Sequence, residues 1–148
     1  EEKKFLKVLK KMSECVFCSI VEGKIPCYKV YENKEILAFL DINPVNPGHT
    51  LIIPKKHYET ILDVDDETLK KLAVVIKNIS SAVYSGLKLK GFNIGINQFK
   101  VAGQVVPHLH VHIIPRKEND GIRLWPTREY ESKEERKRVQ EKITRLLK

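Results

Sequence analysis

Residues 108–114 of the chain read HLHVHII. Histidine alternates here with branched apolar residues, a pattern typical of a strand in which successive side chains point to opposite faces. His108, His110 and His112 are therefore expected on one face, roughly 6–7 Å apart along the strand at about 3.3 Å per residue. Three titratable rings on one face carry desolvation and repulsion costs that Leu or Val would avoid, so we expect this face to be functional.

A row of imidazoles suits two kinds of chemistry. A neutral ring can attack a phosphorus centre as a nucleophile. Alternatively, rings at positions i and i+2 of a strand can hold a catalytic metal and leave one coordination position open. The spacing alone does not choose between these chemistries, and both stay open at this point.

The chain on either side of this stretch contains four further runs with strand character. They are rich in β-branched and aromatic residues or alternate apolar with small residues, and turn-forming residues separate them. The short connection between the first two is typical of a hairpin. The four runs are Tyr28–Glu32, Ile36–Leu40, His49–Ile53 and Phe92–Asn97.

Two helices are predicted beside these strands. Apolar residues recur at helical spacing from Asp65 onward, with Gly86 placed just past the end, which predicts a central helix. Near the C-terminus, Ser132 and Glu135 have capping-box spacing and open an amphipathic stretch. Strands with mostly short connections predict an α+β fold, in which an antiparallel sheet of about five strands is covered by helices on one face.

Length and composition limit the class of protein. The 148 residues, 42% hydrophobic and 31% charged, are typical of one soluble globular domain, and no apolar run approaches the roughly 20 residues that span a bilayer. We expect a charged N-terminal extension at residues 1–12, the domain at 13–127 and a C-terminal amphipathic helix at 128–148. The first residues do not resemble an export signal, so we expect a cytoplasmic protein without a membrane partner.

The formal net charge of +8 lies mainly at the two ends of the chain. Residues 1–12 contain five Lys and two Glu, and residues 128–148 contain eight Lys or Arg and five Glu, so each end carries +3. The part between them is nearly balanced, at +2. Basic ends on a balanced body are typical of solvated helix surface, so nucleic acid is not an expected partner.

The stretch HLHVHII resembles the signature of the histidine triad (HIT) superfamily of nucleotide hydrolases and transferases. The similarity runs from about Cys15 to Arg116, includes VFCSIVEGKIP, AFLDINPVNPGHTLIIPKKH and AGQVVPHLHVHIIPR, and looks like the Hint-type branch. It implies a HIT-like fold and cleavage at the α-phosphate of AMP-type substrates, either nucleoside phosphoramidates or dinucleoside polyphosphates. It also implies a purine nucleotide (AMP- or GMP-type) as ligand and a homodimer formed through the central helix and an edge strand.

The resemblance assigns roles to three histidines. His110, the middle histidine, would attack the α-phosphate as a neutral ring and become transiently nucleotidylated. His112, together with His49 at the start of the GHTLIIP strand, would border the phosphate and steady its charge. No catalytic cofactor is expected.

The resemblance also assigns polar residues that, with His112, form the expected nucleotide site. Asp41 matches the acidic residue that receives the ribose hydroxyls, since a carboxylate accepts from two neighbouring donors; a turn-capping Asp is the alternative. Asn97 and Gln104 match amides near the phosphate. Val105 departs from the pattern, because many Hint-type relatives carry serine after the glutamine, and the departure removes a hydroxyl donor.

Cys15 and Cys18 form a CxxC pair with a common zinc-binding spacing. If the fold brings His57 and His108 to this pair, the four form a closed and therefore structural zinc site. Zinc-bearing HIT proteins resemble the sequence at these four positions. A reduced thiol pair or a redox couple is the alternative, although no thioredoxin-like pattern surrounds the pair. Cys27 is left over and is expected to be buried filler.

Two other functions stay open. In the first, the triad itself holds a catalytic zinc, so that chelation abolishes activity and no phosphohistidine forms. In the second, the protein is a nucleotide-binding scaffold whose hydrolysis is incidental, and His110→Ala leaves its role intact.

Overall fold

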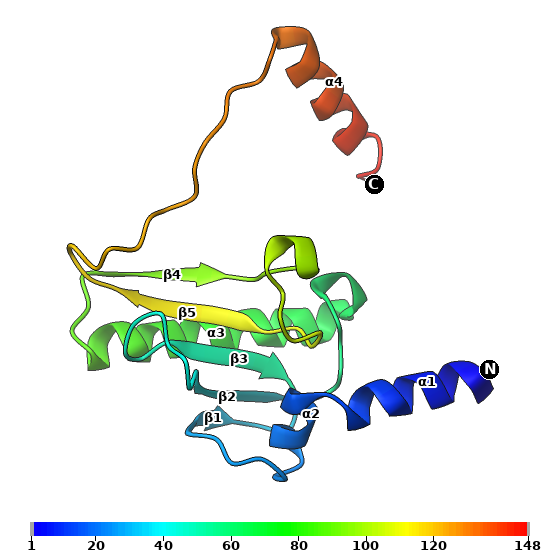
Figure 1. Ribbon diagram of the computed structural model, residues 1–148, viewed down its shortest axis with the longest axis vertical. Helices are drawn as coiled ribbons and strands as arrows, with labels where there is room; N and C mark the ends of the chain where they lie inside the picture. Colours follow the sequence, from blue (N-terminus) through cyan, green and yellow to red (C-terminus); the bar gives the residue numbers. More distant parts are fainter. Residues whose placement is uncertain (1, 148) are drawn as a thin grey trace. The chain divides into compact units, whose positions relative to one another are not determined.

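The computed structural model describes residues 2–147 and divides into two compact units, the first ending at Glu118 and the second beginning at Asn119 (Figure 1). The first unit contains α1 (Glu2–Ser13), α2 (Val16–Val21), β1 (Lys29–Glu32), β2 (Ile36–Leu40), β3 (Thr50–Pro54), η1 (Ile61–Asp63), α3 (Asp66–Gly86), β4 (Gly91–Gly95), η2 (Lys100–Ala102) and β5 (Val111–Arg116). The second unit contains α4 (Lys133–Thr144). In residues 2–147, no helix is both long and apolar enough to cross a membrane.

The strands form one five-stranded sheet in the order β1-β2-β3-β5-β4, and all neighbouring strands are antiparallel. This arrangement confirms the predicted α+β class and its antiparallel sheet. The chain enters β5 from a long connection, and β5 is inserted between β3 and β4. Strand β5, which carries His112, is therefore an interior strand and is held on both sides.

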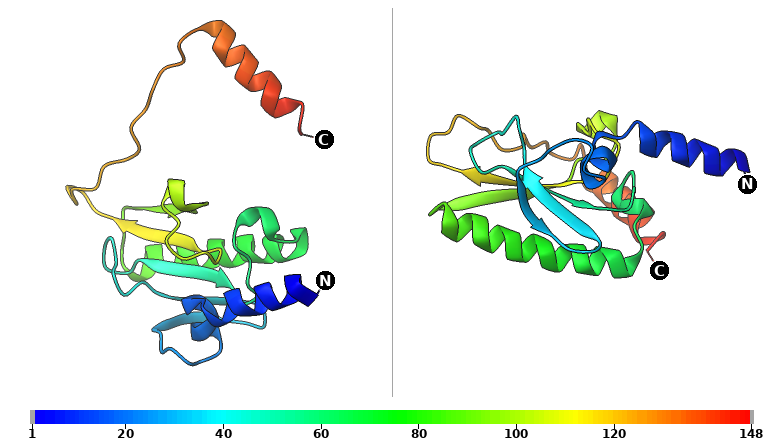
Figure 2. Two further views of the ribbon diagram at one scale, coloured as in Figure 1. Left: turned by 45° about the vertical axis from the view of Figure 1, so that its right-hand side comes forward. Right: turned by 90° about the horizontal axis from the view of Figure 1, so that it is seen from below.

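Each face of the sheet packs against a different helix (Figure 2). On one face, Ile52, Val111 and Ile113 pack with Leu72 and Ile79 of α3. On the other face, a second cluster combines the sheet residues Leu37, Phe39, Leu51 and Ile53 with Cys15, Phe17 and Cys18 from the start of α2. Helix α3 thus covers one face, as expected, while α2 covers part of the histidine face and was not anticipated.

Helix α3 begins where its sequence predicts and ends one residue later, because Gly86 is included in it. The Asp65 side chain caps it by accepting a 2.9 Å hydrogen bond from the Thr68 backbone N–H, and Asp66 and Glu67 add negative charge to the first turn. Its apolar positions recur every three to four residues and turn a single stripe toward the sheet. The helix ends at Gly86.

The ends of the chain form helices α1 and α4. Helix α1 occupies the segment that the sequence indicated only as a charged extension, and its described side chains are exposed. Helix α4 confirms the predicted C-terminal helix, since the Ser132 hydroxyl accepts from the Glu135 backbone N–H at 3.0 Å. It spans Lys133–Thr144 and is therefore shorter than the predicted helix at 128–148.

Strand β5 begins at Val111 rather than at His108, which corrects the predicted strand. The cause is a change of hydrogen-bond partner: the Leu109 N–H donates to the Tyr58 carbonyl at 2.7 Å, outside the β3 ladder. Side chains still alternate through this segment, because Leu109 and Val111 are in the α3 core while His110 lines a pocket on the opposite face.

Candidate functional site

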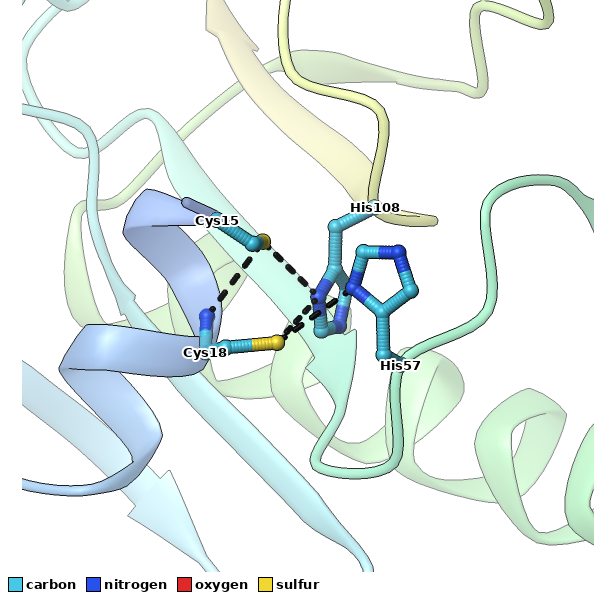
Figure 3. Close-up of side chains that lie close together, drawn as sticks. All are labelled: Cys15, Cys18, His57 and His108. Atoms are coloured by element: carbon cyan, nitrogen blue, oxygen red, sulfur yellow. Dashed lines mark hydrogen bonds between the residues drawn. The ribbon is translucent and has the colours of Figure 1, made fainter. Parts of the chain in front are cut away.

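Two cysteines and two histidines converge beside the N-terminus of α2 (Figure 3). Cys15 Sγ lies 3.4 Å from His108 Nδ1, and Cys18 Sγ lies 3.3 Å from His57 Nδ1 and 3.6 Å from His108 Nδ1. One ligand atom from each residue lies within 4.8 Å of all the others. The structure thus brings together the four residues that the sequence singled out, from α2, from the loop after β3 and from the segment before β5.

These four residues fit a tetrahedral zinc ion. Zn–S bonds of about 2.3 Å and Zn–N bonds of about 2.0 Å at the tetrahedral angle separate sulfur from nitrogen by about 3.5 Å, close to the three observed distances. His108 Nε2 donates to the Pro54 carbonyl at 2.8 Å, which leaves its Nδ1 lone pair facing the sulfurs. Burial and the neighbouring Cys15 thiol raise the pKa of Cys18 to about 12, so a cation is needed to hold its thiolate.

His110 has the opposite tautomer. Its Nδ1 lies 2.7 Å from the His108 carbonyl, and because a carbonyl only accepts, Nδ1 must carry the proton. The Nε2 atom therefore has a free lone pair. Burial lowers the pKa of His110, which keeps the ring neutral, and the Phe17 ring packs edge-on against it at 5.1 Å between ring centroids.

His49 and His112 form a hydrogen-bonded pair whose direction is fixed by the backbone. The Val45 N–H donates to His49 Nδ1 at 3.1 Å, so the proton of neutral His49 is on Nε2. That proton is donated to His112 Nδ1 at 2.9 Å, which places the His112 proton on Nε2. Burial lowers the pKa of His49 and lowers that of His112 to about 4, so both rings are neutral near pH 7.

His112 Nε2 is a buried donor without a hydrogen-bond partner in residues 2–147. An unpaired buried donor costs free energy, on the order of 1–3 kcal/mol, unless a ligand supplies the acceptor. His112 also lines the pocket described below, so a bound anion there would satisfy this donor.

Asp41 forms a second group of potential metal ligands with His49 and His112. Its Oδ2 lies 3.8 Å from His49 Nε2. Because the Val45 N–H holds the His49 proton on Nε2, that atom has no lone pair for a metal. Asp41 Oδ1 accepts from the Asn43 N–H at 2.8 Å, as a turn-forming aspartate does, and Asp41 also lines the pocket described below. The geometry favours a chain of hydrogen bonds with fixed donors and acceptors, rather than a metal centre, at these three residues.

A pocket of about 430 Å³ opens on the histidine face, within the size range of small-molecule sites. His110 and His112 line it together with Asp41, while its remaining walls are mainly apolar. Cys27, expected to be buried filler, is half-buried and contributes to the wall. The apolar lining residues are Val16, Phe17, Ile20, Ile25, Pro26, Phe39, Leu40, Ile42, Leu51, Val105 and Val106.

The side-chain amides of Asn97 and Gln104, which were predicted to lie near the phosphate, contact the loop before β5. Gln104 Oε1 accepts from the Phe99 N–H and its Nε2 donates to the Glu59 carbonyl, both at 2.7 Å. Asn97 Nδ2 lies 3.5 Å from the Gly103 carbonyl. Both side chains thus hold this loop, and their expected contact with a phosphate stays a prediction. His49 is buried behind the pocket wall, where it contacts His112.

Residues 22–119 match the model of the HIT domain. The chain belongs to the HIT family. Its CxxC pair and histidine cluster, with the relatives below, support the Hint-like branch.

Three relatives illustrate the match. An uncharacterized HIT-like protein of Methanocaldococcus jannaschii is 50% identical over 107 residues, which cover 72% of this chain and 82% of that protein. An adenylylsulfatase of Arabidopsis thaliana is 43% identical over 76% of this chain and 56% of its own length. An adenosine 5'-monophosphoramidase of Saccharomyces cerevisiae is 40% identical over 78% of this chain and 72% of its own length.

Solved structures share the fold. A HIT family protein from Bacillus subtilis has a TM-score of 0.84 and 39% identity, covering 91% of this chain and 98% of that one. A zinc-bound HIT family protein from Mycobacterium smegmatis has a TM-score of 0.70 and 38% identity, covering 91% and 96%.

Proposed function

We propose that this HIT protein is a nucleotide hydrolase or transferase that cleaves at the α-phosphate of AMP-type substrates through a nucleotidylated His110. The observation that carries the proposal is the His110 tautomer: the 2.7 Å contact of Nδ1 with the His108 carbonyl leaves a lone pair on Nε2 of a ring that lines the pocket. Relatives named as an adenylylsulfatase and an adenosine 5'-monophosphoramidase support it, since both names describe cleavage at an adenylyl group.

In the first step, the His110 Nε2 lone pair attacks the α-phosphorus, and the bond from phosphorus to the leaving nitrogen or oxygen breaks. The leaving group keeps that electron pair and takes a proton from water. His112 Nε2–H donates a hydrogen bond to the charge that develops on the phosphoryl group or the leaving atom, which gives the unpartnered donor its acceptor.

In the second step, water attacks the phosphorus and the P–N bond to His110 breaks. The electron pair returns to Nε2, the nucleoside monophosphate is released, and the remaining proton passes to solvent. Another nucleophile in place of water would make the same reaction a transfer. Asp41 lines the pocket, and its carboxylate is suited to accept from the ribose hydroxyls.

Zinc is proposed as a structural ion held by Cys15, Cys18, His57 and His108. When bound, it would tie the start of α2 to the segment before β5 and so fix the His108 carbonyl that orients His110. The triad as a catalytic zinc site is less consistent with the geometry, because His108 Nδ1 faces the cysteines while the His110 and His112 rings face the pocket.

The proposal is tested by incubating the full chain with adenosine and guanosine 5'-phosphoramidates and with dinucleoside polyphosphates. Wild type should release the monophosphate, and His110→Ala should lower the rate by at least about a hundredfold. Rapid quenching should trap a nucleotidylated peptide that contains His110. Equal rates in wild type and His110→Ala would contradict the proposed enzyme activity. The nucleotide-binding scaffold would then be the remaining function.

A further inference from the structure

Helix α1 lies outside the part of the chain that matches the HIT domain, because that match begins at residue 22. None of its described residues lines the nucleotide pocket or belongs to the cysteine and histidine cluster. Its sequence, EKKFLKVLKKMS, nevertheless has a regular pattern: apolar residues recur at helical spacing, and lysines occupy most of the positions between them. The proposed function leaves this pattern unused.

The two sides of α1 have opposite character. Successive residues of an α-helix are rotated by about 100°, so four of the lysines lie within an arc of about 120°. Phe5 and Leu6 lie on the other side of the helix. The four lysines are Lys3, Lys4, Lys7 and Lys10.

The apolar side of α1 is open to solvent. Phe5 is 64% exposed and Leu6 is 57% exposed. Neither residue belongs to one of the two core clusters that pack on the sheet. An amphipathic helix of a globular protein ordinarily turns its apolar side toward the core, so these two large side chains call for a partner outside the chain.

We propose that α1 binds the surface of an anionic lipid membrane. Its lysines would face the negatively charged headgroups, while Phe5 and Leu6 would enter the boundary between headgroups and acyl chains. The 12 residues of the helix extend about 18 Å, less than the roughly 30 Å of a hydrocarbon core, so the helix would lie along the surface. This contact departs from the predicted absence of a membrane partner, because that prediction considered only long apolar runs and an export signal.

Charge and apolar surface together favour a lipid surface over two other partners. A nucleic-acid backbone would bind the lysines and leave Phe5 and Leu6 in water. A second copy of α1 would cover the apolar side, but it would bring together two helices that each carry five lysines and one glutamate. An anionic membrane complements both sides of the helix at once.

A bound α1 would hold the domain close to the membrane. The helix ends at Ser13, and Cys15 already caps α2 and packs in the cluster on the histidine face of the sheet. Only Glu14 separates the two. The connection is therefore too short to act as a long flexible tether.

The test is co-sedimentation of the full chain with lipid vesicles. One set contains equal parts of phosphatidylcholine and phosphatidylserine, and the other contains phosphatidylcholine alone. Wild type should bind the anionic vesicles at least about tenfold more tightly, since each basic residue near an anionic surface strengthens binding several-fold. Added salt should weaken this binding, because it screens the charges.

Phe5→Asp tests the apolar side and should weaken binding to the anionic vesicles by about tenfold or more, because it replaces apolar surface with a repelled charge. Leu62→Asp is the matched control: Leu62 is 78% exposed in η1, so the same change should leave vesicle binding as in wild type. Both side chains are exposed, so both variants should keep the thermal midpoint of wild type.

A pair of lysine variants tests the basic side. Lys4→Gln with Lys7→Gln should weaken binding by about tenfold. Lys137→Gln with Lys142→Gln removes the same charge from α4, whose basic residues are mixed with glutamates, and should leave binding nearly unchanged. Equal losses in the two double variants would show attraction by net charge alone and would overturn the role of α1.

The remaining outcomes also decide the proposal. No binding of wild type to the anionic vesicles, or equal binding of wild type and Phe5→Asp, would overturn it. Absence of vesicle binding together with a lower mass of Phe5→Asp by light scattering would show that a second copy covers α1 instead. Hydrolysis of a soluble phosphoramidate should be equal in Phe5→Asp and wild type, because α1 does not line the pocket, so the proposed function stands or falls separately.

Discussion

The three histidines of residues 108–112 differ in which ring nitrogen carries the proton, and this difference assigns their tasks. His108 donates from Nε2 to the Pro54 carbonyl, whereas His110 donates from Nδ1 to the His108 carbonyl. His112 accepts a hydrogen bond from His49 on Nδ1 and carries its own proton on Nε2. Fixed backbone groups thus point one lone pair at the cysteines, one lone pair into the pocket, and leave one donor for an anion.

His49 is predicted to be a positioning residue, since it acts through His112. His49→Ala removes the donor to His112 Nδ1, so His112 can invert its tautomer and lose the Nε2–H; kcat should fall by roughly 10- to 100-fold, with KM for the nucleotide changed much less. His49→Gln can present an amide N–H to His112 and should recover part of kcat. Steady-state kinetics on one phosphoramidate measures both variants. Equal losses in Ala and Gln would indicate a packing role instead.

At the scale of elements, α2 depends more on its contacts through the group of Cys15, Cys18, His57 and His108 than on its own length. With six residues it is too short to be stable alone, and its N-cap is Cys15, whose sulfur accepts from the Cys18 N–H at 3.4 Å. Phe17 and the two cysteines then pack against the sheet. The cluster therefore joins a marginal helix to the segment before β5, which carries His108 and His110.

Removal of this cluster is expected to loosen α2 before it affects the sheet. Cys18→Ser should abolish zinc binding by mass spectrometry of metal content and lower the thermal midpoint by several degrees, because a closed zinc site contributes to folding. Cys27→Ser is the matched control, since Cys27 is outside the ligand set, and its zinc content should equal that of wild type. Full zinc in Cys18→Ser, or none in wild type, would contradict the site.

The sequence predicts the central helix and the strands well, and the short helix α2 poorly. The central helix shows several turns of apolar spacing, and its start at Asp65 is predicted correctly, while its end lies one residue further along, at Gly86. Helix α2 spans less than two turns, so no periodicity could reveal it. The loop role of Gln104 was equally hidden, because its partners are the backbone groups of Phe99 and Glu59, and a residue's identity does not report contacts to distant backbone.

At the scale of the whole molecule, a single copy of the first unit leaves one sheet edge unpaired and a neighbouring hollow unfilled. Strand β4 is an edge of the sheet, with Ile94 48% exposed, and an unpaired edge is open to further strand pairing. Beside it, a hollow of about 430 Å³ between α3 and β4 is lined by Tyr84, Phe92 and Ile94 among others. Ser80 also lines it, and its buried hydroxyl has no hydrogen-bond partner in the described chain.

We therefore predict a two-fold homodimer in which β4 and α3 of two copies meet, because this contact would pair the edge strand, fill the hollow and offer Ser80 a partner. Light scattering should give a mass near twice the 17.1 kDa of one chain. Ile94→Asp should shift that mass toward one chain, since it places an unpaired charge in the interface. Val30→Asp is the matched control: Val30 is similarly exposed, at 44%, on β1 at the opposite edge, so its mass should stay dimeric. A monomeric wild type would refute the dimer. Dissociation by Val30→Asp but not by Ile94→Asp would show that the interface is formed by β1 and not by β4.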